Sequence, residues 1–305
     1  MSTFNYTIII PHHNIPLLLK RCLESIPKRK DLQVIVIDDC SDESCKWIES
    51  YSKNWGDFIF IENKIPKGAG HARNLGLSSI KGKFVIFADC DDFFSADFSL
   101  ILEKYKSSNF DLIFFNAKSV YSDNLEKESE RANHVQNYIN DYFINNDLFN
   151  LRYYFTEPWC KIIKSELILD NHIKFEETIV ANDYLFSLNV GYFASNITVE
   201  TMVGYIITLR PDSLSLSFQT TEKILARIGV SRRAYNFYKS HNLNCKERYL
   251  NYLLCTLLKQ SPIDFIKVFF GMLFNGDFGQ LIHFFCFCLK KLVLKIADIT
   301  KRTFS

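Results

Sequence analysis

The 305-residue sequence has no uninterrupted run of about 20 apolar residues, and its charges almost cancel, with 36 Lys and Arg against 34 Asp and Glu. The first absence excludes a simple membrane-spanning helix. The second excludes a strongly basic protein built to bind nucleic acid, so we expect no nucleic-acid partner. Hydrophobic residues nevertheless make up 48% of the chain, which excludes a disordered protein and predicts a sizeable core.

The sequence also lacks the cysteine patterns of zinc sites and disulfide frameworks. Its nine cysteines include no Cys-x-x-Cys pair and no Cys/His zinc spacing, and their number is odd. Reduced thiols in a cytosol are therefore expected. Residues 1–6 are polar and show neither the charged region nor the cleavage site of a secretory signal, so a cytoplasmic location is the expectation.

Short apolar runs alternate with helix-like segments through the first 115 residues. We expect strands at 6–10, 33–37, 58–61, 84–87 and 112–115, and helices at 16–25, 42–55, 69–79 and 96–107. This alternation predicts βαβ units and an α/β fold with a mostly parallel sheet flanked by helices.

The pattern becomes more helical after residue 118. Expected there are a polar loop or insertion at 119–135, a helix from 137 with Tyr138, Ile139, Tyr142 and Phe143 on one face, short strands at 197–200 and 205–208, a helical stretch at 220–260 and an apolar tail from 262. We place a first domain at 1–217, with halves 1–118 and 119–217, and a helical region at 218–305.

Polar clusters fall at the expected carboxyl ends of three strands, at residues 11–14 (Pro-His-His-Asn), 38–39 (Asp-Asp) and 89–92 (Asp-Cys-Asp-Asp). Ligands of open parallel sheets bind beyond the carboxyl ends of the strands, so the three clusters are candidates for one site. Taken singly, Asp38 and Asp39 are as typical of a turn and helix N-cap, and 89–92 is compatible with a solvated turn.

Residues 89–92 favour a metal site. Three carboxylates in four residues repel one another, and a cation would offset that repulsion. Hard divalent cations such as Mg²⁺ or Mn²⁺ take oxygen ligands, often one or two carboxylates together with substrate phosphates. The cluster therefore suits a complex of a metal ion with a diphosphate.

A glycine-containing entry to a helix lies between these clusters. Gly68 and Gly70 precede Arg73, so backbone N–H groups and a guanidinium are candidates for anion binding. No Gly-Lys-Ser/Thr follows, which excludes a Walker A loop. The glycines do not follow the first strand, which excludes a dinucleotide-binding fingerprint.

Read together, four segments in this order resemble the family 2 inverting glycosyltransferases: Ile8–Asn14, Val36–Asp42, Gly68–Gly76 and Phe87–Asp92. The resemblance implies a GT-A fold, in which one continuous α/β domain binds a nucleotide sugar, here with a C-terminal helical extension. It extends more weakly to about residue 217, through Glu157–Ile163, Phe175–Phe186 and Arg210–Ser215.

The resemblance implies a role for each matching residue on the donor side. Pro11 and Asn14 would lie in the nucleoside pocket, Asp39 would accept a hydrogen bond from the base, and Arg73 would lie near the base or the diphosphate. The donor would be a nucleotide sugar, UDP-linked in our interpretation.

Residues 89–92 would be the metal and donor-sugar end of the same site. Asp89 and Asp91 match the family's Asp-x-Asp pair, with Asp91 as the main ligand of Mg²⁺ or Mn²⁺. Cys90 and Asp92 would be neighbouring contacts to the donor.

Asp183 matches the catalytic base of the family, and Trp159, Lys161 and Asn182 would lie on the acceptor side. The sequence departs from the family pattern at His13, where Tyr is usual, and at Asn182, where Glu is usual. Loss of that negative charge should make Asp183 easier to ionise, because a like charge raises the pKa of a carboxyl group. An N-cap role for Asp183 is the alternative.

These parts imply a metal-dependent inverting transfer from a nucleotide sugar to a saccharide or lipid-linked acceptor in surface-polysaccharide (O-antigen or capsule-like) biosynthesis. Two alternatives stay open. A sugar nucleotidyltransferase would carry a basic, glycine-rich loop after the first strand, where this chain has Pro11–Asn14. A nucleotide-sugar-binding scaffold would keep the fold with little turnover.

Eight of the 28 Phe fall between 265 and 287, and the segment 262–297 pairs apolar runs with basic residues. Each run is too short to span a bilayer, so an in-plane helix on the cytoplasmic face of a membrane is expected. The alternative is a helical hairpin packed on the catalytic domain or on a dimer partner.

Overall fold

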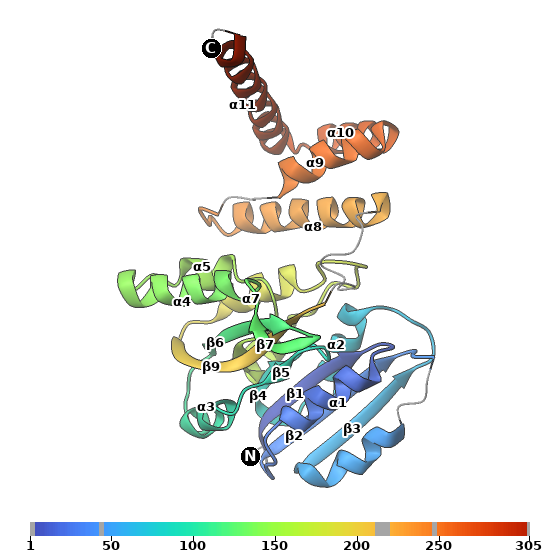
Figure 1. The fold of residues 1–305 in the computed structure, drawn as a ribbon, viewed down its shortest axis with the longest axis vertical. Helices are drawn as coiled ribbons and strands as arrows, with labels where there is room; N and C mark the ends of the chain where they lie inside the picture. The colour runs from blue at the N-terminus through green and yellow to red at the C-terminus, as the bar shows by residue number, and fades with distance from the viewer. Residues whose placement is uncertain (1–3, 43–45, 211–219, 246–248, 304–305) are drawn as a thin grey trace. The chain divides into compact units, whose positions relative to one another are not determined.

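The computed structural model describes residues 4–42, 46–210, 220–245 and 249–303 (Figure 1). The chain divides into two compact units, 1–217 and 218–305, each with an apolar core of its own. The predicted boundary between the two domains falls within 211–219, which lies outside the described residues.

A nine-stranded sheet forms the centre of the described part of the first unit. Its strands are β1 (Phe4–His12), β2 (Leu32–Asp39), β3 (Asp57–Asn63), β4 (Gly82–Phe87), β5 (Phe93–Phe94), β6 (Leu112–Tyr121), β7 (Asn124–Glu128), β8 (Lys161–Lys164) and β9 (Ile197–Leu209). They are ordered β3-β2-β1-β4-β8-β6-β9-β5, and β7 pairs with β6 off this path.

The half of the sheet from β3 to β4 is parallel, and Ile8 of β1 pairs with Val34 of β2 on one side and Ile86 of β4 on the other. Every residue of β2 is buried, as expected for a Val- and Ile-rich strand covered on both faces. Parallel strands end at a common edge, so the polar clusters that follow β1, β2 and β4 lie together. The predicted α/β fold with a mostly parallel sheet is confirmed.

The other half of the sheet brings the end of β9 to this edge. β6 pairs with β9 in parallel, and β9 also pairs with the two-residue strand β5, where Phe93 lies opposite Ile206. Since β5 directly follows residues 89–92, this pairing sets Thr208 and Arg210 beside the acidic cluster.

Helices cover the sheet and connect its strands (Figure 1). They are α1 (Pro16–Ser25), the 3₁₀ helix η1 (Lys46–Asn54), α2 (Ala69–Leu77), α3 (Phe98–Tyr105), α4 (Asn133–Asn145), α5 (Phe149–Tyr153), α6 (Ser165–Asp170) and α7 (Tyr184–Phe193). α4 contacts α5, and α5 contacts α7, so these three helices form one group.

Helix α2 packs closely on both sides through two glycines. A Cβ at Gly70 would collide with the carbonyl oxygen of Glu176, and one at Gly76 would lie 2.6 Å from Cγ2 of Ile9. Both contacts are closer than side-chain carbons allow, so α2 occupies a position that a larger residue at either site would change.

Three sequence-based expectations for the first unit were wrong in part. The polar segment 119–135 is not only a loop: β6 continues to Tyr121 and β7 completes a hairpin, whose five exposed side chains give no apolar alternation. The short runs at 197–200 and 205–208 are one strand, β9, interrupted in register by a bulge. The expected helix at 42–55 is a 3₁₀ helix at 46–54, and 43–45 lie outside the described residues.

The expected apolar face of the helix after residue 137 is correct except at one position. Ile139 is buried, and Tyr138 and Tyr142 pack against the core. Phe143 is 54% exposed, and the buried residues of α4 are Ile139 and Val135.

The second unit is helical throughout its described residues, with α8 (Thr221–Ser240), α9 (Leu250–Gln260), α10 (Pro262–Phe274) and α11 (Phe278–Thr303). The expected helical stretch 220–260 is therefore two helices. α8 ends where Asn242 adopts a left-handed conformation with φ of 54°, which Asn tolerates better than most residues. Ile224, Leu254 and Met272 belong to a core shared by the four helices.

Within the part of the chain that the structure describes, no helix is both long and apolar enough to cross a membrane.

Candidate active site

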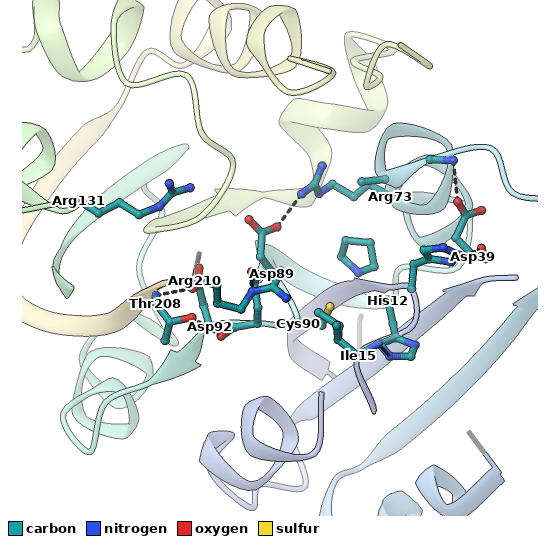
Figure 2. Close-up of a pocket in the computed structure, with 15 residues that line it drawn as sticks. His12, Ile15, Asp39, Arg73, Asp89, Cys90, Asp92, Arg131, Thr208 and Arg210 are labelled. Atoms are coloured by element: carbon teal, nitrogen blue, oxygen red, sulfur yellow. Dashed lines mark hydrogen bonds and ion pairs between the residues drawn. The ribbon is translucent and has the colours of Figure 1, made fainter. Parts of the chain in front are cut away.

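A cavity of about 400 Å³ lies at the carboxyl edge of the parallel strands (Figure 2). Its walls come from the ends of β1, β2, β4 and β9, the segment before α4 and the start of α2. The lining residues are Pro11, His12, His13, Ile15, Asp39, Gly68, Ala69, Arg73, Asp89, Cys90, Asp91, Asp92, Arg131, Thr208 and Arg210. The three polar clusters of the sequence thus meet in one cavity, and with them all the predicted donor-side residues except Asn14.

Asp89, Asp91 and Asp92 offer carboxylate oxygens that all lie within 4.8 Å of one another. Three hard oxygen donors at this spacing fit Mg²⁺ or Mn²⁺ better than softer ions. The protein compensates their mutual repulsion with guanidinium groups, since Arg73 pairs with Asp89 and Arg210 with Asp91.

Asp92 is directed toward the protein. It is 3% exposed, and its Oδ1 accepts a hydrogen bond of 2.7 Å from the backbone N–H of Thr208. Burial, together with the neighbouring charges of Asp91 and Asp89, raises the pKa of Asp92 well above its usual range. Its contact fastens the end of β9 to the acidic cluster.

Asp91 pairs with Arg210, the residue that directly follows β9. Its Oδ2 lies 3.1 Å from Nε and 2.9 Å from Nη2 of Arg210. Burial and the charge of Asp89 raise the pKa of Asp91, and Arg210 opposes that effect. The Asp91 carbonyl also accepts a hydrogen bond from Thr208 Oγ1 at 2.7 Å.

Arg73 connects the acidic cluster to the segment before α7. Its Nη2 lies 2.6 Å from Asp89 Oδ1, its Nη1 donates to Asn182 Oδ1 at 2.8 Å, and its guanidinium lies 5.2 Å from the ring centre of Phe175. The side chain is buried, so these charge-assisted contacts are made with little screening by water. Figure 2 shows Arg73 reaching Asp89 across the cavity.

Asp183, the predicted base, directly follows Asn182 at the start of α7 and does not line the cavity itself. It occupies the N-cap position, but its side chain makes no capping hydrogen bond, so the alternative role as a cap finds no support. Burial raises the pKa of Asp183 to about 6; the positive charge of Arg73 opposes this, and Glu157 and Asp89 add to it. The pKa of Asp183 is therefore above its ordinary value even though residue 182 is the neutral Asn182 and not Glu.

The opposite wall of the cavity is formed by the ends of β1 and β2. Asp39 accepts hydrogen bonds from the backbone N–H groups of Lys67 (3.1 Å) and Gly68 (2.6 Å) and from Asn63 Nδ2 (3.0 Å). It thereby fixes the turn that leads into α2. Its predicted hydrogen bond to a nucleobase remains a prediction.

His12, which lines the cavity, forms a buried pair with Asp38 at the ends of β1 and β2. His12 Nδ1 lies 2.7 Å from Asp38 Oδ1, while His12 Nε2 accepts from the backbone N–H of Ile15 at 3.2 Å. With Nε2 as acceptor, Nδ1 carries the proton and donates to Asp38. The pair joins β1 to β2 at their carboxyl ends, where the two residues are register partners.

Asn14 lies outside the cavity lining although it was expected in the nucleoside pocket. It is exposed, has φ of 55°, and exchanges hydrogen bonds with Asp42 through its side-chain amide. His13, the departure from the family pattern, does line the cavity and contacts the Asp39 carbonyl at 2.9 Å through Nδ1.

Trp159 and Lys161, expected on the acceptor side, are both buried and do not line this cavity. Trp159 stacks on Tyr205, with ring centres 6.0 Å apart. Lys161 Nζ contacts the carbonyls of Phe155 and Glu157, and burial lowers its pKa to about 8. Both residues shape the 155–157 segment, and direct contact with an acceptor remains a prediction.

Two of the residues that sequence reasoning missed are arginines. Arg131 and Arg210 line the cavity together with Thr208, and none of them was predicted as a site residue. Arg210 lay within a matching segment, but Arg131 lay in what was read as a polar loop. Three carboxylates in one cavity need nearby positive charge, which is a reason to expect arginines there but does not identify which ones.

Comparisons with known proteins point to one family. Residues 7–170 match glycosyl transferase family 2. The chain is 25% identical over 219 residues to a poly(ribitol-phosphate) beta-glucosyltransferase of Bacillus spizizenii, covering 69% of this chain and 33% of that protein. It is 28% identical over 230 residues to a cholesterol galactosyltransferase of Borreliella burgdorferi, covering 69% and 64%. The chain thus spans only about a third of the length of the poly(ribitol-phosphate) relative.

Solved structures share the fold. Residues 1–349 of Staphylococcus aureus TarS, in complex with UDP-GlcNAc, align with a TM-score of 0.59 and 21% identity over 84% of this chain and 72% of that one. A Pyrobaculum calidifontis mannosyltransferase in complex with GDP-Man and Mn²⁺ aligns with a TM-score of 0.52 and 14% identity, over 92% and 82%. The predicted GT-A architecture is confirmed. Since the family match covers more than half of the chain, this protein belongs to glycosyl transferase family 2.

Proposed function

We propose that the protein is a divalent-cation-dependent, inverting hexosyltransferase that moves a sugar from a UDP-linked donor to a hydroxyl group of a saccharide or lipid-linked acceptor. One observation carries the proposal. Arg73 joins Asp89 of the acidic cluster to Asn182, so two hydrogen bonds connect the donor-side cluster to the residue beside the candidate base Asp183.

Asp183 is the proposed general base. Inverting transfer is a single displacement at the anomeric carbon, in which a base takes the proton of the acceptor hydroxyl as the nucleotide leaves from the opposite face. A pKa of about 6 leaves Asp183 ionised at neutral pH and still basic enough to accept that proton. General base catalysis of this kind contributes about 10²–10⁴-fold.

Asp91 and Asp89 would hold the cation, for which their oxygen donors are suited. When bound, the cation neutralises negative charge on the diphosphate leaving group. The protein's own contribution is a set of guanidinium groups: Arg73, Arg131 and Arg210 line the same cavity and present fixed positive charge to an anionic donor. Cys90 and Asp92 support this wall.

The comparisons support the choice of donor and of acceptor class. TarS is described in complex with UDP-GlcNAc and with UDP, which favours a UDP-linked donor here. The poly(ribitol-phosphate) transferases among the relatives act on a polymer, which favours a place in surface-polysaccharide assembly. We place that reaction at the cytoplasmic face of the membrane, with peripheral contact through 262–297.

A panel of nucleotide sugars tests the proposal. Purified protein is heated with UDP-, GDP- and dTDP-sugars, with and without Mn²⁺ or Mg²⁺, and nucleotide release is measured in parallel. We expect one UDP-sugar to raise the melting temperature only with metal and to release UDP slowly. Asp91→Ala should abolish the metal-dependent stabilisation.

Two further measurements distinguish the alternative functions. Pyrophosphate release from a nucleoside triphosphate and a sugar 1-phosphate would identify a nucleotidyltransferase. Donor binding without any nucleotide release, across a panel of acceptors, would identify a binding scaffold and contradict the proposed transfer reaction.

A further inference from the structure

The helices α10 and α11 of the second unit each bury one face and expose another that is equally apolar. Their inner faces contribute Met272, Leu281 and Phe284 to the core of this unit. The outer faces carry large apolar side chains that are each at least half exposed: Ile263, Ile266, Phe270 and Phe274 on α10, and Phe278, Ile282, Phe285 and Leu289 on α11.

These eight residues, which we call the outer stripes, follow helical spacing. On α10 they recur at intervals of three, four and four residues, and on α11 at four, three and four. At 100° per residue each set falls on one narrow side of its helix. Exposed fractions reach 87% at Phe274 and 63% at Ile282, so neither stripe is covered by the rest of the described unit. Isolated exposed apolar residues are ordinary, but two aligned rows of four indicate a contact surface.

The charges around the stripes identify the partner. Lys290 and Lys291 on α11 are exposed, and Lys267 on α10 is exposed and pairs with Asp264 at 3.0 Å, whereas Asp277 is buried against Arg232. The sequence from 278 to 305 contains five basic residues and one acidic residue. A second copy of this surface would meet it with like charge, whereas an anionic lipid surface complements it.

We propose that the outer stripes insert into the surface of an anionic bilayer, with Lys267, Lys290 and Lys291 at the level of the lipid headgroups. This inference deepens the peripheral membrane contact of the proposed function by naming the docking surface and the lipid charge. Amphipathic helices of this kind lie in the membrane plane and bury their apolar side by 5–10 Å, a range typical of such helices. No spanning helix is needed, in agreement with the described part of the chain.

Co-sedimentation of the full chain with vesicles tests the proposal without donor or acceptor. Vesicles of phosphatidylcholine with 40% phosphatidylglycerol are compared with pure phosphatidylcholine. We expect binding to the anionic vesicles at least tenfold stronger than to the neutral ones and weaker in 1 M NaCl. Each lysine reversed to Glu should reduce anionic binding by about fivefold or more.

Two stripe variants and a matched control make the test specific. Ile266→Ser/Phe270→Ser/Phe274→Ser and Ile282→Ser/Phe285→Ser/Leu289→Ser should each reduce vesicle binding more than tenfold. The control Leu100→Ser/Ile144→Ser/Leu169→Ser removes equally exposed apolar residues from the first unit and should bind as the wild type does. Circular dichroism checks that each variant keeps its helical content.

The proposal would be overturned if the stripe variants sedimented with anionic vesicles as strongly as the wild type does. It would also be overturned if the wild type did not bind anionic vesicles. A wild-type dimer by light scattering that the stripe variants convert to monomers would instead identify the stripes as a contact between two copies. Because the assay contains no donor, its failure leaves the transfer reaction untouched, and an inactive enzyme can still sediment.

Discussion

The two units of this protein use the same residue type in opposite ways. In the first unit Phe87, Phe114 and Phe186 are completely buried, and Phe186 stacks on Phe175 with ring centres 3.9 Å apart. In the second unit Phe270 is 51% exposed and Phe274 87% exposed. Composition alone gives one high Phe count, but the structure divides these residues between the core of the first unit and an exposed surface of the second.

The comparison indicates that aromatic residues mainly stabilise the core in the first unit and form an exposed contact surface in the second. Buried aromatic groups in the first unit support the ends of the strands from which the carboxylates project. The second unit has a smaller core of its own and exposes the eight large apolar residues of the outer stripes. Chemistry should therefore depend on the first unit, and vesicle binding on the second.

Asp183→Asn gives the largest expected difference between an effect on turnover and an effect on vesicle binding. Replacing the proposed base with a neutral group of the same shape should lower turnover by about 10²–10⁴-fold while leaving donor affinity and vesicle binding unchanged. Turnover is measured as UDP release with acceptor, and affinity by calorimetry. Asp170→Asn, an exposed site on α6, is the control. Near wild-type turnover of Asp183→Asn would contradict the assignment of the base.

Phe186→Ala and Phe274→Ala sharpen the comparison in terms of stability. Removing the buried ring of Phe186 should cost about 3–5 kcal/mol of unfolding free energy, whereas removing the exposed ring of Phe274 should change it by less than about 0.5 kcal/mol. Urea denaturation followed by circular dichroism measures both.

Fluorescence can assign the loss to one unit. Trp47, Trp55 and Trp159 all belong to the first unit, so their emission follows its unfolding alone. We expect the fluorescence midpoint to fall for Phe186→Ala and to stay constant for Phe274→Ala. Equal losses in the two variants would show that the aromatic groups of both units are core residues.

The pH dependence of turnover offers a smaller, graded test. Since burial raises the pKa of Asp183 to about 6, kcat should increase about tenfold per pH unit below pH 6 and become constant above it. Initial rates between pH 4.5 and 8.5 measure this profile. Vesicle binding carried by lysines should not change over the same range, and a flat rate profile would argue against Asp183 as the titrating base.

The smallest effect concerns the stability of the first unit. A carboxyl group whose pKa is raised by folding stabilises the protein below its unfolded pKa, and this contribution is lost as pH rises through about 6. Asp183→Asn should therefore raise the melting temperature by about 6–12 °C at pH 8 and leave it unchanged at pH 4. A difference of equal size at both pH values would assign the effect to packing.

Much of the fold followed from local patterns in the sequence. The apolar runs of β1, β2 and β4 and the polar residues after each of them were sufficient to predict the parallel half of the sheet and the edge where the site lies. β7 was missed because its side chains are all exposed, and β9 was divided because a bulge breaks its alternation. Both features depend on pairing partners that are distant in sequence.

The site was predicted best where its residues adjoin strands. Asp39, Asp89 and Asp91 line the cavity, and Arg73 lines it from α2. Arg131 could not be found in the same way, because nothing in its neighbourhood marks it as part of a cavity formed by other segments. The burial of Trp159 and Lys161 likewise depends on tertiary packing that short motifs do not record.

Gly70 and Gly76 have a consequence for how this site can change over evolution. Arg73 lies between them on α2, and the helix touches the carbonyl of Glu176 on one side and Ile9 on the other. A single added methyl group at either glycine would move the guanidinium away from Asp89 and Asn182. The position of the Arg73 guanidinium therefore depends on two residues, Gly70 and Gly76, that carry neither a charge nor a side chain.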